Sequence, residues 1–349
     1  MKKNFILLLT ILLLAAGCSS DYEILKSQES ISLTADSSVK IMGSTITFTV
    51  RDSKGADQTE NAVIYVDGTA IEGHTYTSAI AGSHEVTADY FSVKSEPVAI
   101  YFHDGTEINF RKNMMIEDYT GTWCGWCPRV AFAINAVHEQ TEDAIAVAIH
   151  GPGTNPNDTG YDPYTYDATE LEKTLSAQGY PKGFLNRTVQ WNFPEPDNVA
   201  QAVALTQGEN PKLGVAMNAV ITGNNISLDV NVVFGKNFTN DLKLVVYVLE
   251  NGLIYDQHNY TSYYQGAILS AYEHNHVLRG CLTNILGDAI AADQTTFSNT
   301  YTRSFNVAVP ANVTNAQNVE FVAFVIDETG KVVNVRKVAP GQNQEMELL

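Results

Sequence analysis

The chain has 349 residues, of which 44% are hydrophobic, and it carries 39 Asp and Glu residues against 21 Lys and Arg residues, a formal net charge of -18. This length and composition predict a folded protein of two or three domains. The negative charge argues against nucleic acid as a partner. The sequence has no Walker-type loop, no GxGxxG loop and no HExxH motif, so we expect no cofactor and no metal.

Residues 1–17 have the features of an export signal peptide: two early lysines, an apolar run over residues 5–16, and small residues before a cysteine. The sequence LAAGC resembles the lipobox of bacterial lipoproteins, which implies that Cys18 carries the acyl chains of a membrane anchor. Each buried methylene of such chains, palmitate for example, contributes about 0.8 kcal/mol to membrane binding. Residues 18–29 would be a linker. The alternative is an ordinary cleaved signal peptide in which Cys18 is incidental.

Residues 30–104 contain short alternating stretches such as TITFTV and VIYV, separated by turn sequences such as DSKGAD. Alternation with β-branched and aromatic residues predicts strands that are buried on one face. We therefore predict a small Ig-like β-sandwich without catalytic residues of its own.

Residues 105–209 change to an alternation of strands and helices. NMMIEDY and AIAVAIHG are predicted to be buried strands. The helix between them should place Val130, Ile134 and Val137 on one face. This order predicts an α/β domain whose sheet is covered by helices.

Residues 210–349 return to short strands such as LKLVVYVLENG and VEFVAFVID, which predict a second β-sandwich. Residues 255–300 are too long for a hairpin loop and are predicted to be a long insertion. The predicted fold class is thus multidomain α+β: an Ig-like β-sandwich, an α/β domain and a C-terminal β-sandwich.

The motif TWCGWCP lies where a strand should end and a helix should begin. The amino terminus of a helix favours a thiolate, and the pKa of such a cysteine falls from about 8.5 to roughly 3.5–7.5. Cys124 is the predicted nucleophile and Cys127, one helical turn later, the resolving thiol. Trp123 and Trp126 would form an apolar rim for a substrate.

Residues 107–208 resemble a thioredoxin fold with TWCGWCP as its redox motif. The segment GYPKGF is similar to the segment that carries the cis-proline of that fold, which implies that Pro181 lies opposite the cysteines. Tyr180 would then present its backbone to a substrate. Asp118 stands where thioredoxins carry a buried acid that assists proton transfer.

The chain also resembles the outer membrane protein 28-related lipoproteins, through EDYTGTWCGWCPR, YPKGFLNR and HVLRG. This resemblance implies a lipid-anchored protein of the outer membrane, facing the periplasm or the surface, and receptor or adhesin roles. It does not identify a reaction.

Two functions remain open from the sequence. The first is thiol–disulfide exchange on exported or cell-envelope proteins through a mixed disulfide, whose direction the sequence leaves open. The second is a non-enzymatic binding or adhesion protein of the outer membrane, in which Cys124 and Cys127 form a structural disulfide. Whether the protein is an enzyme, a thiol–disulfide oxidoreductase, depends on which is correct.

Further residues also have two interpretations. Cys281 is either a small buried apolar residue or a thiol that exchanges with the central pair. The tyrosines of YTSYYQ either form a binding patch or pack the insertion onto its own sandwich. The remaining polar residues are interpreted as turn or surface residues, with a calcium or other metal site as the alternative; they are Asp158, Asp162, Asp167, His138, His150, His274 and His276.

Overall fold

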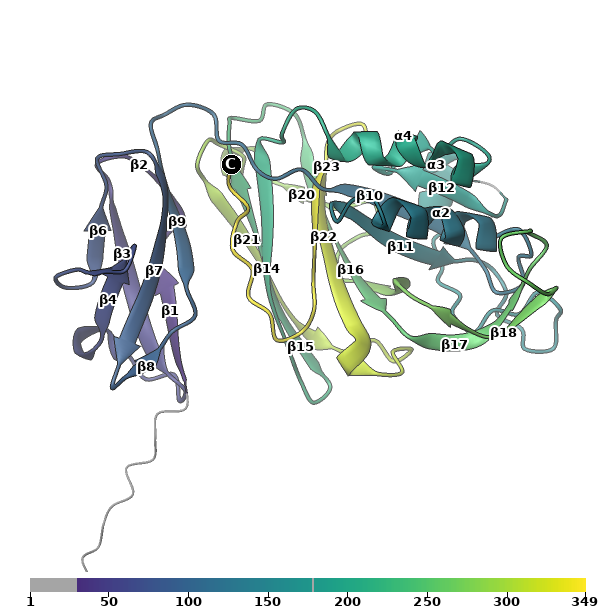
Figure 1. Cartoon of the computed structure of the whole chain (residues 1–349), viewed down its shortest axis with the longest axis horizontal. Helices are drawn as coiled ribbons and strands as arrows, with labels where there is room; N and C mark the ends of the chain where they lie inside the picture. Colours follow the sequence, from purple (N-terminus) through teal and green to yellow (C-terminus); the bar gives the residue numbers. More distant parts are fainter. Residues whose placement is uncertain (1–29, 178) are drawn as a thin grey trace, which may run out of the picture.

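The computed structural model describes residues 30–177 and 179–349 (Figure 1). The predicted signal peptide, Cys18 and the predicted linker lie outside the described residues. A β region at one end of the molecule is joined to a larger, elongated body (Figure 1).

Two sheets form the N-terminal β region and share one core. Their strands are β1 (Ile31–Ala35), β2 (Val39–Ile41), β3 (Thr45–Asp52), β4 (Val63–Val66), β5 (Thr69–Ala70), β6 (Thr75–Thr77), β7 (Gly82–Tyr90), β8 (Val93–Lys94) and β9 (Val98–His103). One sheet has the order β1-β3-β6 and the other β2-β9-β7-β4-β5, with β8 on β7. Ile46, Phe48 and Val50 alternate into the core from β3, as a half-buried strand requires. The β-sandwich elements predicted for this region are present.

A nine-stranded sheet forms the centre of the larger body. It contains β10 (Met114–Thr120), β11 (Ala144–His150), β12 (Lys182–Leu185), β13 (Val189–Gln190), β16 (Leu242–Glu250), β19 (Val277–Cys281), β20 (Asp288–Ile290), β22 (Val319–Ile326) and β23 (Val332–Val338). The strand order is β13-β12-β10-β11-β19-β16-β22-β23, and β20 pairs with β16. β10 is buried along its whole length, because both its edges are paired and both its faces are covered.

A parallel strand pair and a chain of polar contacts connect β10–β13 to the strands that follow residue 210 in the same sheet. β11 pairs in parallel with β19, with Ala148 opposite Val277. Arg187, which follows β12, donates to the hydroxyl of Tyr247 on β16 at 2.5 Å. That hydroxyl donates to Glu117 on β10 at 3.2 Å, so a fully buried polar group joins strands that are far apart in the sequence.

The predicted fold class is wrong. Strands make up 44% of the protein and helices 12%, and no separate thioredoxin-like α/β domain is formed. The strands predicted to close an α/β sheet within residues 105–209 instead continue into the strands of the C-terminal part. The local alternation of strands and helices suggested a sheet of its own, but the free edge of β11 is covered by β19 rather than by a local segment.

The three α-helices of the described chain are short and lie against the β10–β12 part of the sheet (Figure 1). They are α2 (Pro128–His138), α3 (Thr169–Leu175) and α4 (Val199–Val203), the last flanked by the 3-10 helices η2 (Glu195–Asn198) and η3 (Ala204–Thr206). α2 buries Val130, Ile134 and Val137, the face predicted from their spacing. These side chains pack with β10 and β11 residues in one core.

A second layer and a separate hairpin complete the body. β14 (Leu213–Thr222), β15 (Asn225–Phe234) and β21 (Thr300–Ala308) form a three-stranded sheet that shares a core with β16 and β22. β17 (Leu253–His258) and β18 (Ile268–His274) form a separate two-stranded sheet in the described part of the chain. The predicted insertion 255–300 therefore holds most of this hairpin together with β19 and β20. No helix in the described ranges has the length and apolarity needed to span a membrane.

Candidate functional site

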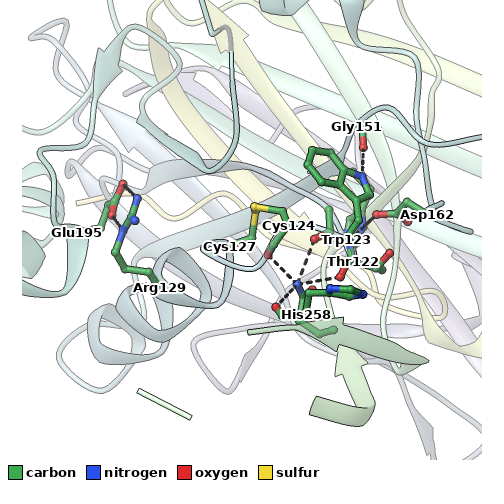
Figure 2. The surroundings of a disulfide bond; sticks show 12 residues. Thr122, Trp123, Cys124, Cys127, Arg129, Gly151, Asp162, Glu195 and His258 are labelled. Atoms are coloured by element: carbon green, nitrogen blue, oxygen red, sulfur yellow. Dashed lines mark hydrogen bonds and ion pairs between the residues drawn. A yellow bond between two sulfur atoms is a disulfide. The ribbon is translucent and has the colours of Figure 1, made fainter. Parts of the chain in front are cut away.

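Cys124 and Cys127 form a disulfide between the end of β10 and the start of α2 (Figure 2). Cys127 is the residue before α2, and Pro128 occupies its first position, where a missing N–H leaves no hydrogen bond unmade. The two cysteines are 5% and 1% exposed. The motif thus lies where the sequence predicts, and both cysteine residues are almost fully buried.

The β17–β18 hairpin covers the cysteine loop, residues 121–127, by backbone pairing. The His258 amide donates to the Thr122 carbonyl at 2.9 Å, and the Tyr260 amide donates to the Gly125 carbonyl at 2.6 Å. Only glycine fits at position 125, since a Cβ there would lie 2.4 Å from the Tyr260 ring. The loop and the hairpin are therefore shaped to each other.

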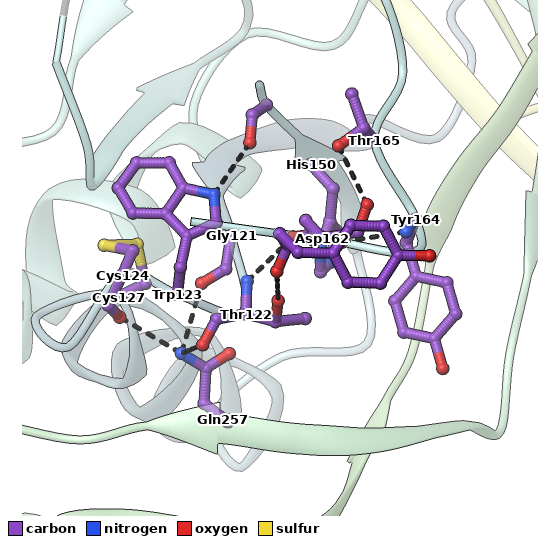
Figure 3. A network of polar contacts seen from close by, with 12 residues as sticks. Gly121, Thr122, Trp123, Cys124, Cys127, His150, Asp162, Tyr164, Thr165 and Gln257 are labelled. Carbon is purple, nitrogen blue, oxygen red and sulfur yellow. Dashed lines mark hydrogen bonds and ion pairs between the residues drawn. A yellow bond between two sulfur atoms is a disulfide. The ribbon is translucent and has the colours of Figure 1, made fainter. Parts of the chain in front are cut away.

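Gln257 adds a side-chain anchor to the same contact (Figure 3). Its buried amide nitrogen lies 3.1 Å from the Gly121 carbonyl, 3.2 Å from the Thr122 carbonyl and 3.0 Å from the Cys124 carbonyl. The amide has two N–H groups to share among these carbonyls, each of which also accepts from a backbone amide, so Gln257 adds to contacts already made. No sequence motif marks Gln257, because its role depends on a contact across more than a hundred residues.

Asp162 also anchors the loop at Thr122, where Gln257 makes one of its contacts (Figure 3). One carboxylate oxygen accepts from the Thr122 amide at 2.7 Å and lies 2.8 Å from His150 Nδ1, and the other accepts from the Tyr164 amide at 2.8 Å. Burial alone would raise the pKa of Asp162, but the hydrogen bonds from His150 and Thr122 outweigh burial and lower the pKa. Its function is local anchoring, which the sequence did not reveal.

Asp118 differs from Asp162 because its carboxylate is poorly satisfied. It is buried on β10, and Oδ1 has no hydrogen-bond partner. Burial, with a smaller contribution from Glu195, raises its pKa well above the ordinary value, while Arg129 acts in the opposite direction. Asp118 and Cys127 line the same cavity of about 170 Å³. The predicted acid is thus beside the disulfide, and its role in proton transfer remains a prediction.

Trp123 and Tyr180 pack against each other next to the disulfide. Their rings meet edge to face, with centroids 5.6 Å apart, and the Trp123 indole donates to the Gly151 carbonyl at 3.2 Å (Figure 2). The Tyr180 hydroxyl donates to Glu172. The Tyr180–Pro181 peptide bond is cis, as the resemblance implied, and Phe193–Pro194 is a second cis bond that the sequence did not predict.

An aromatic groove of about 550 Å³ opens beside the cysteine loop. Trp126 and Phe193 are 52% and 73% exposed in it. Arg129 lies 4.6 Å from the centroid of the Phe193 ring and forms a buried ion pair with Glu195 at 2.5 Å (Figure 2). The lining residues of the aromatic groove are Trp126, Arg129, Tyr180, Pro181, Phe193, Pro194, Thr261, Ser262 and Tyr263.

The tyrosines of the hairpin tip pack on α2 rather than on a sandwich. Tyr263 stacks on Phe132 with ring centroids 4.6 Å apart, and Tyr264 meets the same ring edge to face. Tyr260 lies 6.0 Å from Trp126, again edge to face. These contacts fix one wall of the aromatic groove.

Several candidate residues lie away from the cysteines or have other functions. Cys281 packs in a different core, where burial raises its pKa, and its sulfur lies 3.5 Å from the Thr283 hydroxyl. Asp167 accepts from the Thr169 amide before α3. Within residues 30–177 and 179–349, no group of three or more His, Cys, Asp or Glu side chains is arranged to hold a metal ion.

Comparison of the structure with solved structures supports the overall arrangement. HBP35 of Porphyromonas gingivalis aligns with a TM-score of 0.51 and 18% identity over 68% of this chain and 77% of that chain, which shows a similar fold. The adhesin InvE of Yersinia pseudotuberculosis aligns over 89% of this chain and 59% of that chain, but its TM-score of 0.16 and 10% identity support no inference. No curated protein matches the sequence.

One family model matches the chain, that of the outer membrane protein Omp28, over residues 168–344. The match begins after Cys127, so it gives no information about the cysteine loop, and the thioredoxin-like part of the sequence-based expectation is not shown. Since the matched residues make up just over half of the 349, the chain belongs to the Omp28 outer membrane protein family.

Proposed function

We propose that this protein is a non-enzymatic binding protein of the cell envelope, which captures an extended apolar segment of another envelope protein in the aromatic groove. In this proposal the Cys124–Cys127 disulfide is a structural cross-link that holds the cysteine loop in place. The observation that carries the proposal is the aromatic groove itself, with largely exposed rings at Trp126 and Phe193 beside a covered disulfide.

The cover over the disulfide supports a structural role. A thiol–disulfide exchange partner must bring its own sulfur in line with one of the two cysteine sulfurs, which requires access. Here Cys124 is buried, and the hairpin holds the cysteine loop through the Gly125 carbonyl and through Gln257. A closed disulfide in this place fixes the start of α2 and so the position of Trp126.

The residue types in the groove support a protein ligand. Trp, Tyr and Arg are enriched at the centres of protein interfaces, because they bury large areas and retain a polar group for hydrogen bonding. The ion pair with Glu195 holds Arg129, one of the lining residues of the groove, in place before a ligand binds. A volume of about 550 Å³ accommodates a few side chains, which favours a short segment over a whole domain surface.

The proposed location is the outer membrane, and two features support it. The family is one of outer membrane proteins. The sequence LAAGC resembles a lipobox, and acyl chains on Cys18 would hold the protein on the membrane without a spanning helix.

Site-specific crosslinking tests the proposed binding. A photoreactive residue at position 193 of the full-length protein, in cells, should crosslink one or a few envelope proteins through short apolar segments. The same residue at position 91 is the control, because Phe91 is 82% exposed in the N-terminal β region. Peptides of the identified segments should bind Trp126→Ala at least about tenfold more weakly than wild type, and Phe91→Ala equally well. Equal crosslinking at both positions would contradict the proposal.

Thiol–disulfide exchange is the second candidate, and one observation favours it: Asp118 has an unpartnered carboxylate oxygen and lines a cavity with Cys127. In that mechanism the Cys124 thiolate attacks a substrate disulfide and releases one substrate thiol. Cys127, deprotonated with Asp118 as the base, attacks the mixed disulfide and releases the second thiol. Two electrons pass from the cysteine pair to the substrate. Trp123, Trp126, Tyr180 and Pro181 would hold the substrate.

The reduction potential of the cysteine pair separates the two candidates. A structural staple should have a potential below about -300 mV, whereas exchange enzymes lie between about -120 and -270 mV. Cys127→Ser should leave Cys124 without mixed disulfides if the pair is structural. A potential in the enzyme range, together with trapped mixed disulfides, would replace the staple with the exchange mechanism.

A further inference from the structure

Four lysines from separate parts of the chain line one hollow of about 380 Å³, here called the lysine hollow. Lys112 precedes β10, Lys212 precedes β14, Lys236 follows β15, and Lys331 lies in the turn between β22 and β23. The fold thus gathers four of the chain's 21 Lys and Arg residues at one place, on a protein whose net charge is -18.

The charges of these lysines are largely uncompensated. Lys212 lies 3.2 Å from a carboxylate oxygen of Glu107, which is its ion-pair partner. The Lys112 amine donates to the Gln207 carbonyl at 2.7 Å and forms no ion pair with a described residue. A carbonyl fixes the position of an ammonium group but does not neutralise it.

Lys236 and Lys331 also lack carboxylate partners within 4.0 Å in the described part of the chain. Lys236 lies 5.2 Å from the centroid of the Phe238 ring, a cation–π contact that holds its amine at the hollow. The amine of Lys331 extends from an exposed turn. Both amines are therefore available to an anion.

Two carboxylates share the lining and Glu107 pairs with Lys212 from outside it, so the four lysines face three carboxylates. Asp327 uses one oxygen to accept from the amides of Thr329 and Lys331, at 2.9 and 3.1 Å, within its own turn. Glu209 lies on an exposed loop, where water screens its charge. The net positive charge of the hollow therefore remains available to an anionic ligand.

The remaining lining suits a sugar ring. It includes Asn113, Asn186 and Asn210 beside Leu205, Phe238 and Val333. The side-chain oxygen of Asn186 already accepts from the Met115 amide at 3.0 Å. Amide side chains bond hydroxyl groups as donors and acceptors, and an aromatic ring covers the apolar face of a sugar. Lysines bind a phosphate as point charges.

We infer that the lysine hollow binds a phosphorylated sugar, with the phosphate near Lys112, Lys236 and Lys331 and the ring toward Phe238. The sugar phosphate is either a free metabolite or the headgroup of a phosphorylated glycolipid. This site is independent of the aromatic groove, because the two share no lining residue.

Isothermal titration of the chain from residue 19 onward tests the site, with glucose 6-phosphate, glucose and inorganic phosphate as probes. Glucose 6-phosphate should bind more tightly than either part alone, and high salt should weaken its binding. The triple variant Lys112→Gln, Lys236→Gln, Lys331→Gln should lose at least tenfold in affinity. Lys54→Gln and Lys94→Gln, in the N-terminal β region, are the matched controls and should bind as wild type does.

Two further measurements complete the test. Lys331→Gln alone changes an exposed turn residue and should weaken binding while the unfolding midpoint stays unchanged, so a folding defect in the triple variant cannot decide the result. If the protein binds vesicles that contain lipid A, and the binding depends on the lysines, the sugar phosphate is a glycolipid headgroup. If it does not bind them, the ligand is a free sugar phosphate. Glucose 6-phosphate binding that is absent, or equal in the lysine variants, would overturn the inference.

Discussion

The two sides of the cysteine loop are built differently. On one side, Asp162 and Gln257 meet the loop with nearly every hydrogen bond made. On the other side, Asp118 keeps an unpartnered oxygen and Trp126 is half exposed. The satisfied side stabilises the loop, whereas the other side retains groups that could act on a ligand. Substitutions on the two sides should therefore change stability in opposite directions.

Asp162→Ala should have the largest effect. It leaves the Thr122 and Tyr164 amides without an acceptor and His150 without its partner, and buried groups of this kind cost about 3–5 kcal/mol of unfolding free energy. The pKa of Asp162 is lowered in the folded state, so its stabilisation is present above the ordinary value of 3.8 and is lost as the pH falls.

Urea unfolding between pH 3 and pH 7 measures this effect. Asp162→Ala should be less stable than wild type at pH 7. Its free energy of unfolding should fall less than that of wild type when the pH is lowered to 3. Asp158→Ala in the same loop is the control and should change stability by less than about 0.5 kcal/mol, because Asp158 is exposed. Equal losses in the two variants would show that Asp162 is not an anchor.

Asp118→Asn should act in the opposite direction. Burial raises the pKa of Asp118 in the folded state, so wild-type stability falls as the pH rises from the ordinary value of 3.8 toward the folded pKa. A neutral amide removes this penalty, and we expect about 1–3 kcal/mol higher stability at pH 7, with little difference at pH 3. Urea unfolding at both pH values measures this difference in the free energy of unfolding, and Asp158→Asn is the control. If Asp118→Asn is less stable than wild type at pH 7, favourable interactions of the carboxylate outweigh its cost of burial, and the prediction is wrong.

Gly125→Ala should have an effect no larger than that of Asp118→Asn, and it tests the covering hairpin. The new Cβ would lie 2.4 Å from the Tyr260 ring, so the hairpin must move, at a cost of about 1–3 kcal/mol. Hydrogen exchange of the His258 and Tyr260 amides should become faster. Gly160→Ala is the control, since its Cβ would meet nothing within 4 Å. Unchanged exchange in the Gly125 variant would mean that the hairpin is not held by this contact.

The elements were more predictable than their assembly. The period-two pattern of β3 and the spacing of Val130, Ile134 and Val137 in α2 follow from local sequence, and both are observed. The order of strands in the sheet does not follow from local sequence, because β11 and β19 pair across more than a hundred residues. An alternating strand–helix pattern does not indicate which later strand will cover an edge, and the fold class was wrong for that reason.

The site was predictable where a motif carried it. The Cys124–Cys127 disulfide and the cis bond before Pro181 were expected from TWCGWCP and GYPKGF and are both present, whereas the catalytic roles of these residues stay predictions. Gln257 was not predictable, since it acts through a hairpin whose place against the cysteine loop depends on the whole fold. Phe193 was missed for the same reason: an exposed ring in a loop gives no periodic signal.

The shared sheet also affects the order in which the chain is completed. During synthesis from the amino terminus, β10, β11 and β12 emerge well before β19, so one edge of β11 has no partner until Val277 is made. An uncovered strand edge is a template for pairing with other chains. The cysteine-containing half is thus most exposed to aggregation while the polypeptide is unfinished, and truncated forms that end before residue 277 should be the ones that need a chaperone.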